Sequence, residues 1–244
     1  MSGLWSAIAF LTRLPVPATD VRLDAAVPWF PLVGLLLGGI LALADMGLRL
    51  GAVSPFVASA LLVTLLLVLT GALHADGLID TCDAVFGHAT PERRLEIMRD
   101  PRTGAFGVVG LVCVVVLKVA GVEALPTATR AATLVLAPTL GRWAIVVLAC
   151  AFPYGRLSGL GQPLKQGATP RALVLASLLP VAVCVAVWPS GPLLGVLALA
   201  IALGAGRWLM SMLPGLTGDC YGAACEVVET VTWLAAAPLA RAFG

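Results

Sequence analysis

The chain has 244 residues, of which 60% are hydrophobic and only 11% are charged. A soluble domain carries roughly 25% charged residues, so this composition excludes a water-soluble globular protein. It also excludes a disordered chain, which requires low hydrophobicity and high charge. The formal net charge of +2 is too small to indicate a nucleic-acid partner. We therefore expect the chain to fold within a lipid bilayer.

Seven apolar runs are long enough to cross a bilayer. They lie near residues 30–50, 53–73, 105–125, 131–152, 172–188, 192–213 and 226–243, and the last run is the weakest. Most of the breaks between them are short, as expected for antiparallel neighbouring helices. The sequence therefore predicts an all-α fold, a single polytopic membrane domain over residues 1–244 with about six or seven transmembrane helices.

Basic residues collect on one side of this predicted topology. That side receives the N-terminal segment and the segments 74–104, 153–171 and 214–225, which together hold most of the arginines and lysines outside the spans. The opposite side receives only Arg49, Arg130 and Arg241. Because positively charged loops remain in the cytoplasm, we expect the first side to be cytoplasmic.

An acidic segment follows the second span and reads GALHADGLIDTCDAVFG over residues 71–87. In a helix, Asp76, Asp80 and Asp83 fall at i, i+4 and i+7, within an arc of about 60°. Carboxylates that share one face repel each other unless a cation lies between them. Mg²⁺ or Mn²⁺ suits such ligands and keeps positions for water and phosphate. The alternative is a solvated loop, because Gly77 and Gly87 weaken the helix.

A second, short helix is predicted to begin at Thr90, which can cap it, with Pro91 at its first position. This helix ends at Asp100, before Pro101. Four arginines lie on or just after it, and guanidinium groups bind phosphate oxygens through paired hydrogen bonds. They are Arg93, Arg94, Arg99 and Arg102. Their alternative role is to anchor the neighbouring spans at the cytoplasmic face.

The sequence LTGDCYGAACEVVE at residues 216–229 supplies further acids. Asp219 and Glu226 are seven residues apart and share a helical face. Gly222 lies between them and permits close helix packing. Asp219 has a simple alternative role as an N-cap. Glu226 and Glu229 lie in a predicted span, where an acidic residue indicates function.

Other polar residues give weaker indications. Lys118, Arg142 and Arg207 lie in predicted spans, where each either reaches substrate, pairs with an acid or extends to the interface. His74 is a candidate proton carrier beside the acids or a structural histidine. The stretch GRLSGLGQPLKQG at 155–167 lacks P-loop spacing and is either a phosphate cradle or an ordinary loop. Gly34-x-x-x-Gly38 is a helix-packing signature.

Three motifs in this order resemble the cobalamin synthase family, the adenosylcobinamide-GDP ribazoletransferases. They are GALHADGLIDTCDAVFG, ERRLEIMRDPRTGAFG and LTGDCYGAACEVVE, and the segments FLTRLPVP and FPLVGLLLG also resemble the family. The likeness covers nearly the whole chain. Ala75, Ala84 and Pro101 stand where the family usually has leucine, glycine and serine, and none of these departures removes an acidic residue.

The resemblance implies a bacterial inner-membrane enzyme that joins adenosylcobinamide-GDP to α-ribazole, or to its 5′-phosphate, and releases GMP with Mg²⁺ as cofactor. On this hypothesis the metal ligands are Asp76, Asp80 and Asp83, completed by Asp100 or Asp219. The catalytic residues are Asp76, Asp80, Asp83 and Asp219. The substrate-binding residues are Arg94, Arg99, Arg102, Asp100, Glu226 and Lys118.

The expected partners are these small-molecule substrates and the lipid bilayer, and no nucleic acid. A homo-oligomer, or an association with other cobalamin-assembly enzymes, stays open. Two other functions use the same acids. A divalent-cation transporter requires acids spread along several spans near the bilayer midplane. A CDP-alcohol-type phosphotransferase usually carries a D-G-x-x-A-R run, which is absent after Asp76.

Overall fold

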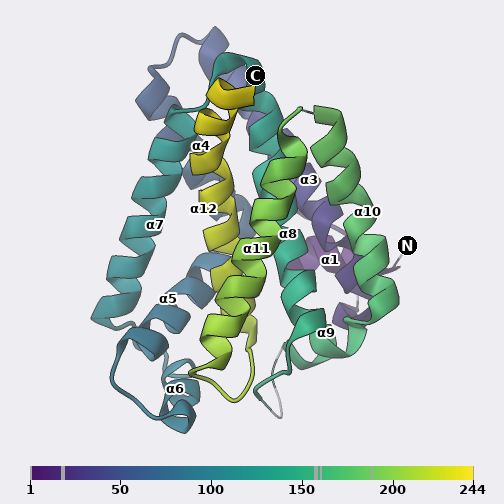
Figure 1. Cartoon of the computed structure of the whole chain (residues 1–244), viewed down its shortest axis with the longest axis vertical. Coiled ribbons are helices and arrows are strands. Elements are labelled where there is room, and N and C mark those ends of the chain that lie inside the picture. Colours follow the sequence, from purple (N-terminus) through teal and green to yellow (C-terminus); the bar gives the residue numbers. More distant parts are fainter. Residues whose placement is uncertain (1, 18–19, 157–158, 160, 188, 244) are drawn as a thin grey trace.

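A computed structural model describes residues 2–17, 20–156, 159, 161–187 and 189–243. These residues form helices and no β-strand. Figure 1 shows the long helices running side by side as a bundle. The elements are α1 Ser2–Leu11, α2 Leu23–Ala26, the 3₁₀-helix η1 Val27–Trp29, α3 Phe30–Leu50, α4 Pro55–Thr70, α5 Leu73–Phe86, α6 Pro91–Ile97, α7 Ala105–Glu123, α8 Thr127–Ala151, α9 Gly161–Gly167, α10 Pro170–Val187, α11 Gly191–Met210 and α12 Gly218–Phe243.

Five stretches of helix are long and apolar enough to cross a membrane. They are Leu23–Leu50, Ala105–Glu123, Thr127–Ala151, Gly191–Met210 and Gly218–Ala242. Two further pairs, α4 with α5 and α9 with α10, pass the same test together but are bent by 92° and 89°. Counting each bent pair as one span gives up to seven spans within the described residues. The prediction of an all-α polytopic fold is confirmed.

Two predicted boundaries are wrong. The span expected to begin near residue 226 begins eight residues earlier, because α12 starts at Gly218. Its first turns carry polar side chains such as Tyr221 that are buried against other helices. Hydropathy measures only a preference for lipid, so it does not include these turns in the span. The run 53–73 is not one straight span either, because α4 ends at Thr70 and α5 begins at Leu73.

The break between α4 and α5 is made by two consecutive left-handed residues, Gly71 at φ 59° and Ala72 at φ 56°. A helix that stops in an apolar environment frees backbone carbonyls that must find donors within the protein. The Leu67 carbonyl accepts from the Ala72 amide at 2.8 Å, and the Leu69 carbonyl accepts from the Arg13 amide at 2.7 Å. The chain therefore turns inside the bundle without leaving these carbonyls unpaired.

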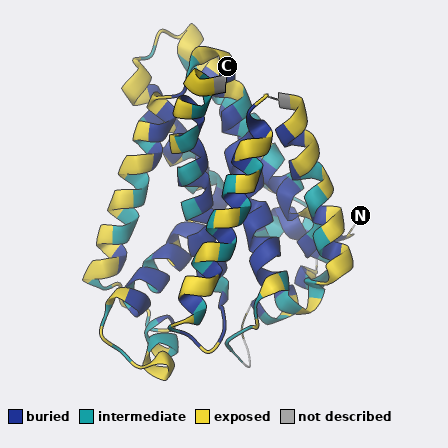
Figure 2. Ribbon diagram, in the orientation of Figure 1, coloured by how far each residue is buried: buried dark blue, intermediate teal, exposed yellow. Residues whose placement is uncertain are grey.

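Helix α8 forms the centre of the bundle. It is buried along most of its length, whereas α7 and α11 expose one side (Figure 2). Helix α3 packs against α8 through Gly34 and Gly38, as their spacing predicts. A Cβ atom on Gly38 would lie 2.5 Å from the Cα of Val135. Small residues therefore set the distance between these two helices.

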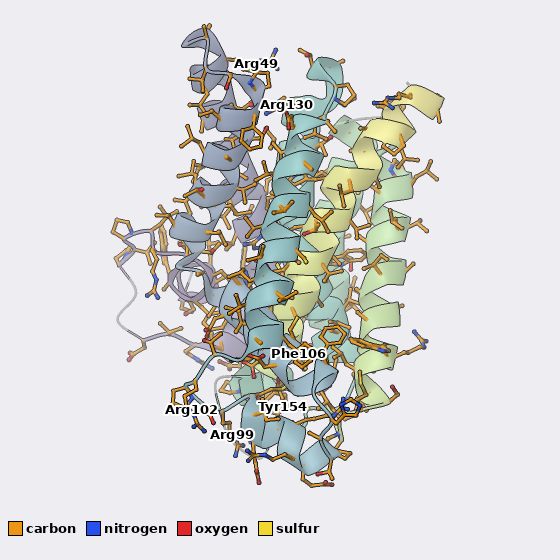
Figure 3. All side chains as sticks on the ribbon, turned by 90° about the vertical axis from the view of Figure 1, so that its left-hand side faces the viewer. Arg49, Arg99, Arg102, Phe106, Arg130 and Tyr154 are labelled. Carbon is orange, nitrogen blue, oxygen red and sulfur yellow. The ribbon has the colours of Figure 1, made fainter. Side chains whose placement is uncertain are left out.

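The two ends of the bundle differ in the residues that they carry. Figure 3 shows Arg49 and Arg130 at one end and Arg99, Arg102 and Tyr154 at the other. This separation is the one that the seven-span topology predicts. The structure thus confirms that the 74–104 and 153–171 segments share one end.

We expect Gly38→Ala to lower the free energy of unfolding by about 1–3 kcal/mol, because the added methyl group meets the backbone of α8. Gly39→Ala is the matched control, since a Cβ there has no neighbour within 4 Å. Chemical unfolding in lipid nanodiscs measures both variants. Equal stability of the two variants would contradict the assignment of Gly38 to the helix contact.

Candidate active site

Helix α5 presents the predicted acidic face. It is continuous through Gly77 and ends before Gly87, so Asp76, Asp80 and Asp83 share one side of it as their spacing predicts. Asp76 is exposed, and the other two are half-buried. The alternative of an irregular loop is thereby excluded.

The start of α12 packs directly against α5. A Cβ on Gly77 would lie 2.8 Å from the backbone oxygen of Asp219, and a Cβ on Gly222 would lie 3.2 Å from the Cα of His74. Only glycine allows the two backbones to come this close. Asp219 lies in the first turn of α12. The predicted juxtaposition of the two acidic segments is therefore present in the fold.

Asp219 is not the N-cap of α12. Thr217 performs that role, because its hydroxyl accepts from the Cys220 amide at 3.3 Å. The Asp219 carboxylate instead accepts from Arg156 Nη2 at 2.8 Å and from the Thr217 hydroxyl at 3.2 Å. Asp219 is thus held as an ion pair at the edge of the acidic face.

Arg156 was not among the predicted site residues. It follows Tyr154, which forms an isolated parallel bridge with Leu216, and the Gly155 amide donates to the Leu216 carbonyl at 2.8 Å. This backbone pairing places Arg156 beside Asp219. The only sequence signal was its position at the start of the glycine-rich stretch 155–167, where Lys165 has a structural role instead and donates to two carbonyls at the end of α8.

Asp83 contacts the N-terminus of α7. Its two carboxylate oxygens accept from the Gly104 amide at 2.7 Å and the Gly107 amide at 2.8 Å. An anionic acceptor at a helix N-terminus satisfies unpaired amides and complements the helix dipole. Asp83 therefore joins α5 to α7, a role that its spacing with the other aspartates does not indicate.

The segment between α5 and α7 holds the predicted arginines. Thr90 caps α6 as predicted, accepting from the Arg93 amide. Arg94 Nε donates to a backbone carbonyl at 3.0 Å, and Arg99 is exposed. Arg102 binds both oxygens of Asp100 at 2.9 and 2.7 Å. These hydrogen bonds lower the pKa of Asp100 to about 2, so Asp100 is ionised and already paired.

A cavity of about 180 Å³ opens between the acidic face of α5 and the start of α12. Asp76 and Asp219 lie on its polar side, and His74 and Tyr221 also line it. Leu73, Phe10, Ile145 and Leu164 form much of its apolar wall. The cavity thus combines two carboxylates with a wall that restricts water.

Lys118 and Glu226 lie in a buried network that does not line this cavity. Lys118 Nζ is 2.7 Å from Glu226 Oε2 and also binds Glu229, which in turn binds Arg142. All four side chains are 6% exposed or less. Two cations balance two anions, which is how buried charges are tolerated in a membrane. Contact of Lys118 or Glu226 with substrate stays a prediction.

The Mg²⁺ expected from the sequence would need ligands from the substrate as well as from the protein. Among the described residues, no group of three or more His, Cys, Asp or Glu side chains is arranged to hold a metal. The carboxylates of Asp76 and Asp80, unlike those of Asp83 and Asp219, accept no hydrogen bond from any residue that the structure describes. Mg²⁺ is commonly held by one or two carboxylates plus substrate phosphates. This pair of carboxylates fits that arrangement.

The fold and the site define a class, the polytopic helical membrane proteins in which carboxylates and arginines gather beside a cavity. The comparisons with known proteins identify the family. The model of cobalamin-5-phosphate synthase matches residues 3–237. The chain therefore belongs to the cobalamin-5-phosphate synthase family.

Curated relatives carry one name, adenosylcobinamide-GDP ribazoletransferase. The protein of Desulfitobacterium hafniense strain Y51 is 39% identical, covering 98% of each chain. That of Stutzerimonas stutzeri strain A1501 is 42% identical, covering 94% of this chain and 95% of the relative. That of Roseiflexus sp. strain RS-1 is 40% identical over 92% of this chain. No solved structure matches.

We expect Asp83→Ala to lower the free energy of unfolding by about 0.5–2 kcal/mol, because the α7 N-terminus loses its side-chain acceptor. Glu96→Ala is the control, since Glu96 forms only an exposed ion pair with Arg93 and such pairs contribute little. Denaturant unfolding in nanodiscs measures both. If the two variants are equally stable, Asp83 does not act as a cap.

Proposed function

We propose that the chain joins adenosylcobinamide-GDP to α-ribazole, or to α-ribazole 5′-phosphate, and releases GMP in the final steps of cobalamin biosynthesis. The observation that carries this proposal is the family match over residues 3–237. The relatives' shared name supports it. The residues around the cavity add the chemistry, because a diphosphate substrate requires carboxylates that can hold a cation and arginines nearby.

The reaction is the attack of a ribose hydroxyl on a diphosphate, with GMP as the leaving group. It requires alignment and charge neutralisation more than a protein nucleophile. Asp76 and Asp80 would hold Mg²⁺, which supplies positive charge against the diphosphate oxygens. Asp219, which also lines the cavity, is fixed by Arg156. One carboxylate of the site accepts the proton of the attacking hydroxyl.

Arginines steady the phosphates from the same end of the bundle. Arg99 and Arg102 stand there on the segment between α5 and α7 (Figure 3), and Arg94 lies on α6 in that segment. Arg156 already lies against Asp219. A guanidinium holds phosphate oxygens through two parallel hydrogen bonds, so binding of a diphosphate would reorganise the Asp100–Arg102 pair.

We place this end in the cytoplasm of a bacterial inner membrane, since the positive-inside rule assigns the arginine-rich segments there. Reporter fusions at the N-terminus and within residues 87–104 should give cytoplasmic signals. A fusion between α7 and α8, near Arg130, should give a periplasmic signal. Periplasmic signals from the first two fusions would overturn the orientation.

The transporter alternative is less compatible with the fold. The acids deepest in the bundle, Glu226 and Glu229, are neutralised by Lys118 and Arg142, so they do not offer free ligands to a passing cation. The free carboxylates Asp76 and Asp80 lie on one short helix. The phosphotransferase alternative still lacks its D-G-x-x-A-R run.

Purified protein in lipid, supplied with adenosylcobinamide-GDP, α-ribazole 5′-phosphate and Mg²⁺, should release GMP and form the joined corrinoid. Addition of a chelator should stop both, because charge on the diphosphate is then not neutralised. Chromatography of nucleotides and corrinoids measures the products. Folded protein that yields no product with either form of α-ribazole would overturn the proposed function.

Asp76→Asn and Asp80→Asn should each lower kcat by about 10²- to 10³-fold or more, as expected when an electrostatic contact to the transition state is lost. Neither variant should unfold the protein, since neither carboxylate has a partner in the described part of the fold. Asp24→Asn is the control, because Asp24 pairs only with Arg22 on the surface. Activity near that of the control in both variants would refute the metal assignment.

A further inference from the structure

Two buried polar atoms belong to residues in the wall of the cavity and have no hydrogen-bond partner among the described residues. They are Nε2 of His74 and the hydroxyl oxygen of Tyr221. His74 is 3% exposed and Tyr221 is 1% exposed. A buried polar atom without a partner is destabilising and indicates a missing ligand or a functional role.

The other ring nitrogen of His74 fixes the position of the proton. Nδ1 lies 3.4 Å from Arg142 Nη2. A guanidinium has only donors, so a hydrogen bond across this contact requires Nδ1 to be the acceptor, without a proton. The proton of the neutral imidazole is then on Nε2. Nε2 is therefore a hydrogen-bond donor that lacks an acceptor.

Arg142 is itself held in place by the buried network. It binds Glu229, which also binds Lys118, and none of these side chains is more than 2% exposed. Because Nδ1 is occupied by Arg142, the ring has no free lone pair with which to take a proton from substrate. His74 is thus suited to donate a hydrogen bond. It is not suited to the role of proton carrier, which the sequence analysis had left open.

Backbone donors at the start of α5 belong to the same stretch of chain as His74. The amides of Leu73, His74 and Ala75 begin α5 and make no hydrogen bond to a residue that the structure describes. The first amides of a helix attract anions through their free N–H groups and through the helix dipole. Leu73 and His74 both line the cavity. A phosphate group, with several oxygen acceptors, suits such a set of donors.

We propose that the Nε2–H group of His74 donates a hydrogen bond to a phosphoryl oxygen of the substrate diphosphate, with Arg142 as the positioning residue that fixes the ring. The Tyr221 hydroxyl lies in the same wall as a second polar contact. The identity of the diphosphate rests on the proposed function, whereas the donor assignment of the ring does not.

The first test reads the tautomer without substrate. The chain has only two histidines, so full-length His88→Gln protein labelled with ¹⁵N-histidine in nanodiscs reports His74 alone. We expect a protonated Nε2 and an unprotonated Nδ1. A proton on Nδ1, or on both nitrogens, would overturn the proposal whether or not the chain is the transferase.

The second test separates the two ring nitrogens by substitution. Glutamine places an amide nitrogen near the position of Nε2, whereas asparagine mimics Nδ1. We expect His74→Asn to lower kcat/KM for adenosylcobinamide-GDP about 10- to 100-fold more than His74→Gln, mainly through KM. Tyr221→Phe should lower it about tenfold. His88→Asn is the control, because His88 is exposed and should be unchanged.

The outcomes distinguish the two proposals. Unsubstituted protein that makes no product refutes the proposed function, and the tautomer still decides the donor assignment. If the unsubstituted protein makes product but His74→Asn and His74→Gln are equally active or equally impaired, the role of Nε2 is refuted and the proposed function stands. An Nε2 resonance that shifts when adenosylcobinamide-GDP is added supports the contact, and an unchanged resonance in active protein refutes it.

Discussion

Backbone groups inside a bilayer must be hydrogen-bonded within the protein, and carbonyls freed at the break between α4 and α5 meet this requirement. The carbonyls freed at the end of α4 accept amides from the Gly71–Ala72 turn and from Arg13. Because these carbonyls are hydrogen-bonded, the chain can bend by 92° between α4 and α5, and α5 packs against α12. The acidic face, the cavity and the unpaired amides of α5 all depend on this change of direction.

The site is assembled from segments far apart in the chain. Glycines at positions 77 and 222 let α5 and α12 meet closely, so that two acidic segments border one cavity. Asp83 connects α5 to α7, and Arg156 connects the segment after α8 to α12. Asp83 and Asp219 thus each fix a helix or loop, whereas Asp76 and Asp80 have no partner among the described residues and remain for a ligand.

Much of this could be predicted because it depends on local spacing. Helical periodicity gave the shared face of α5, Thr90 and Pro91 gave the start of α6, and hydropathy gave the spans. The division of labour among the aspartates could not be predicted, since nothing near Asp83 indicates that amides more than 20 residues away bind it. The left-handed Ala72 has no sequence signal. Hydropathy did not predict the early start of α12. It measures a preference for lipid, whereas the polar side chains in the first turns of α12 are buried against other helices.

The balanced buried charges bear on how the protein is made. Helix α12 carries Asp219, Glu226 and Glu229, and its mean hydropathy of 1.3 is the lowest among the five spans. Acidic residues oppose insertion of an isolated helix by the translocon. Lys118 and Arg142 lie on α7 and α8, which are synthesised first. Helix α12 therefore emerges when the cations that neutralise its acids are already in the membrane. Its insertion then depends on packing against the helices that were inserted before it.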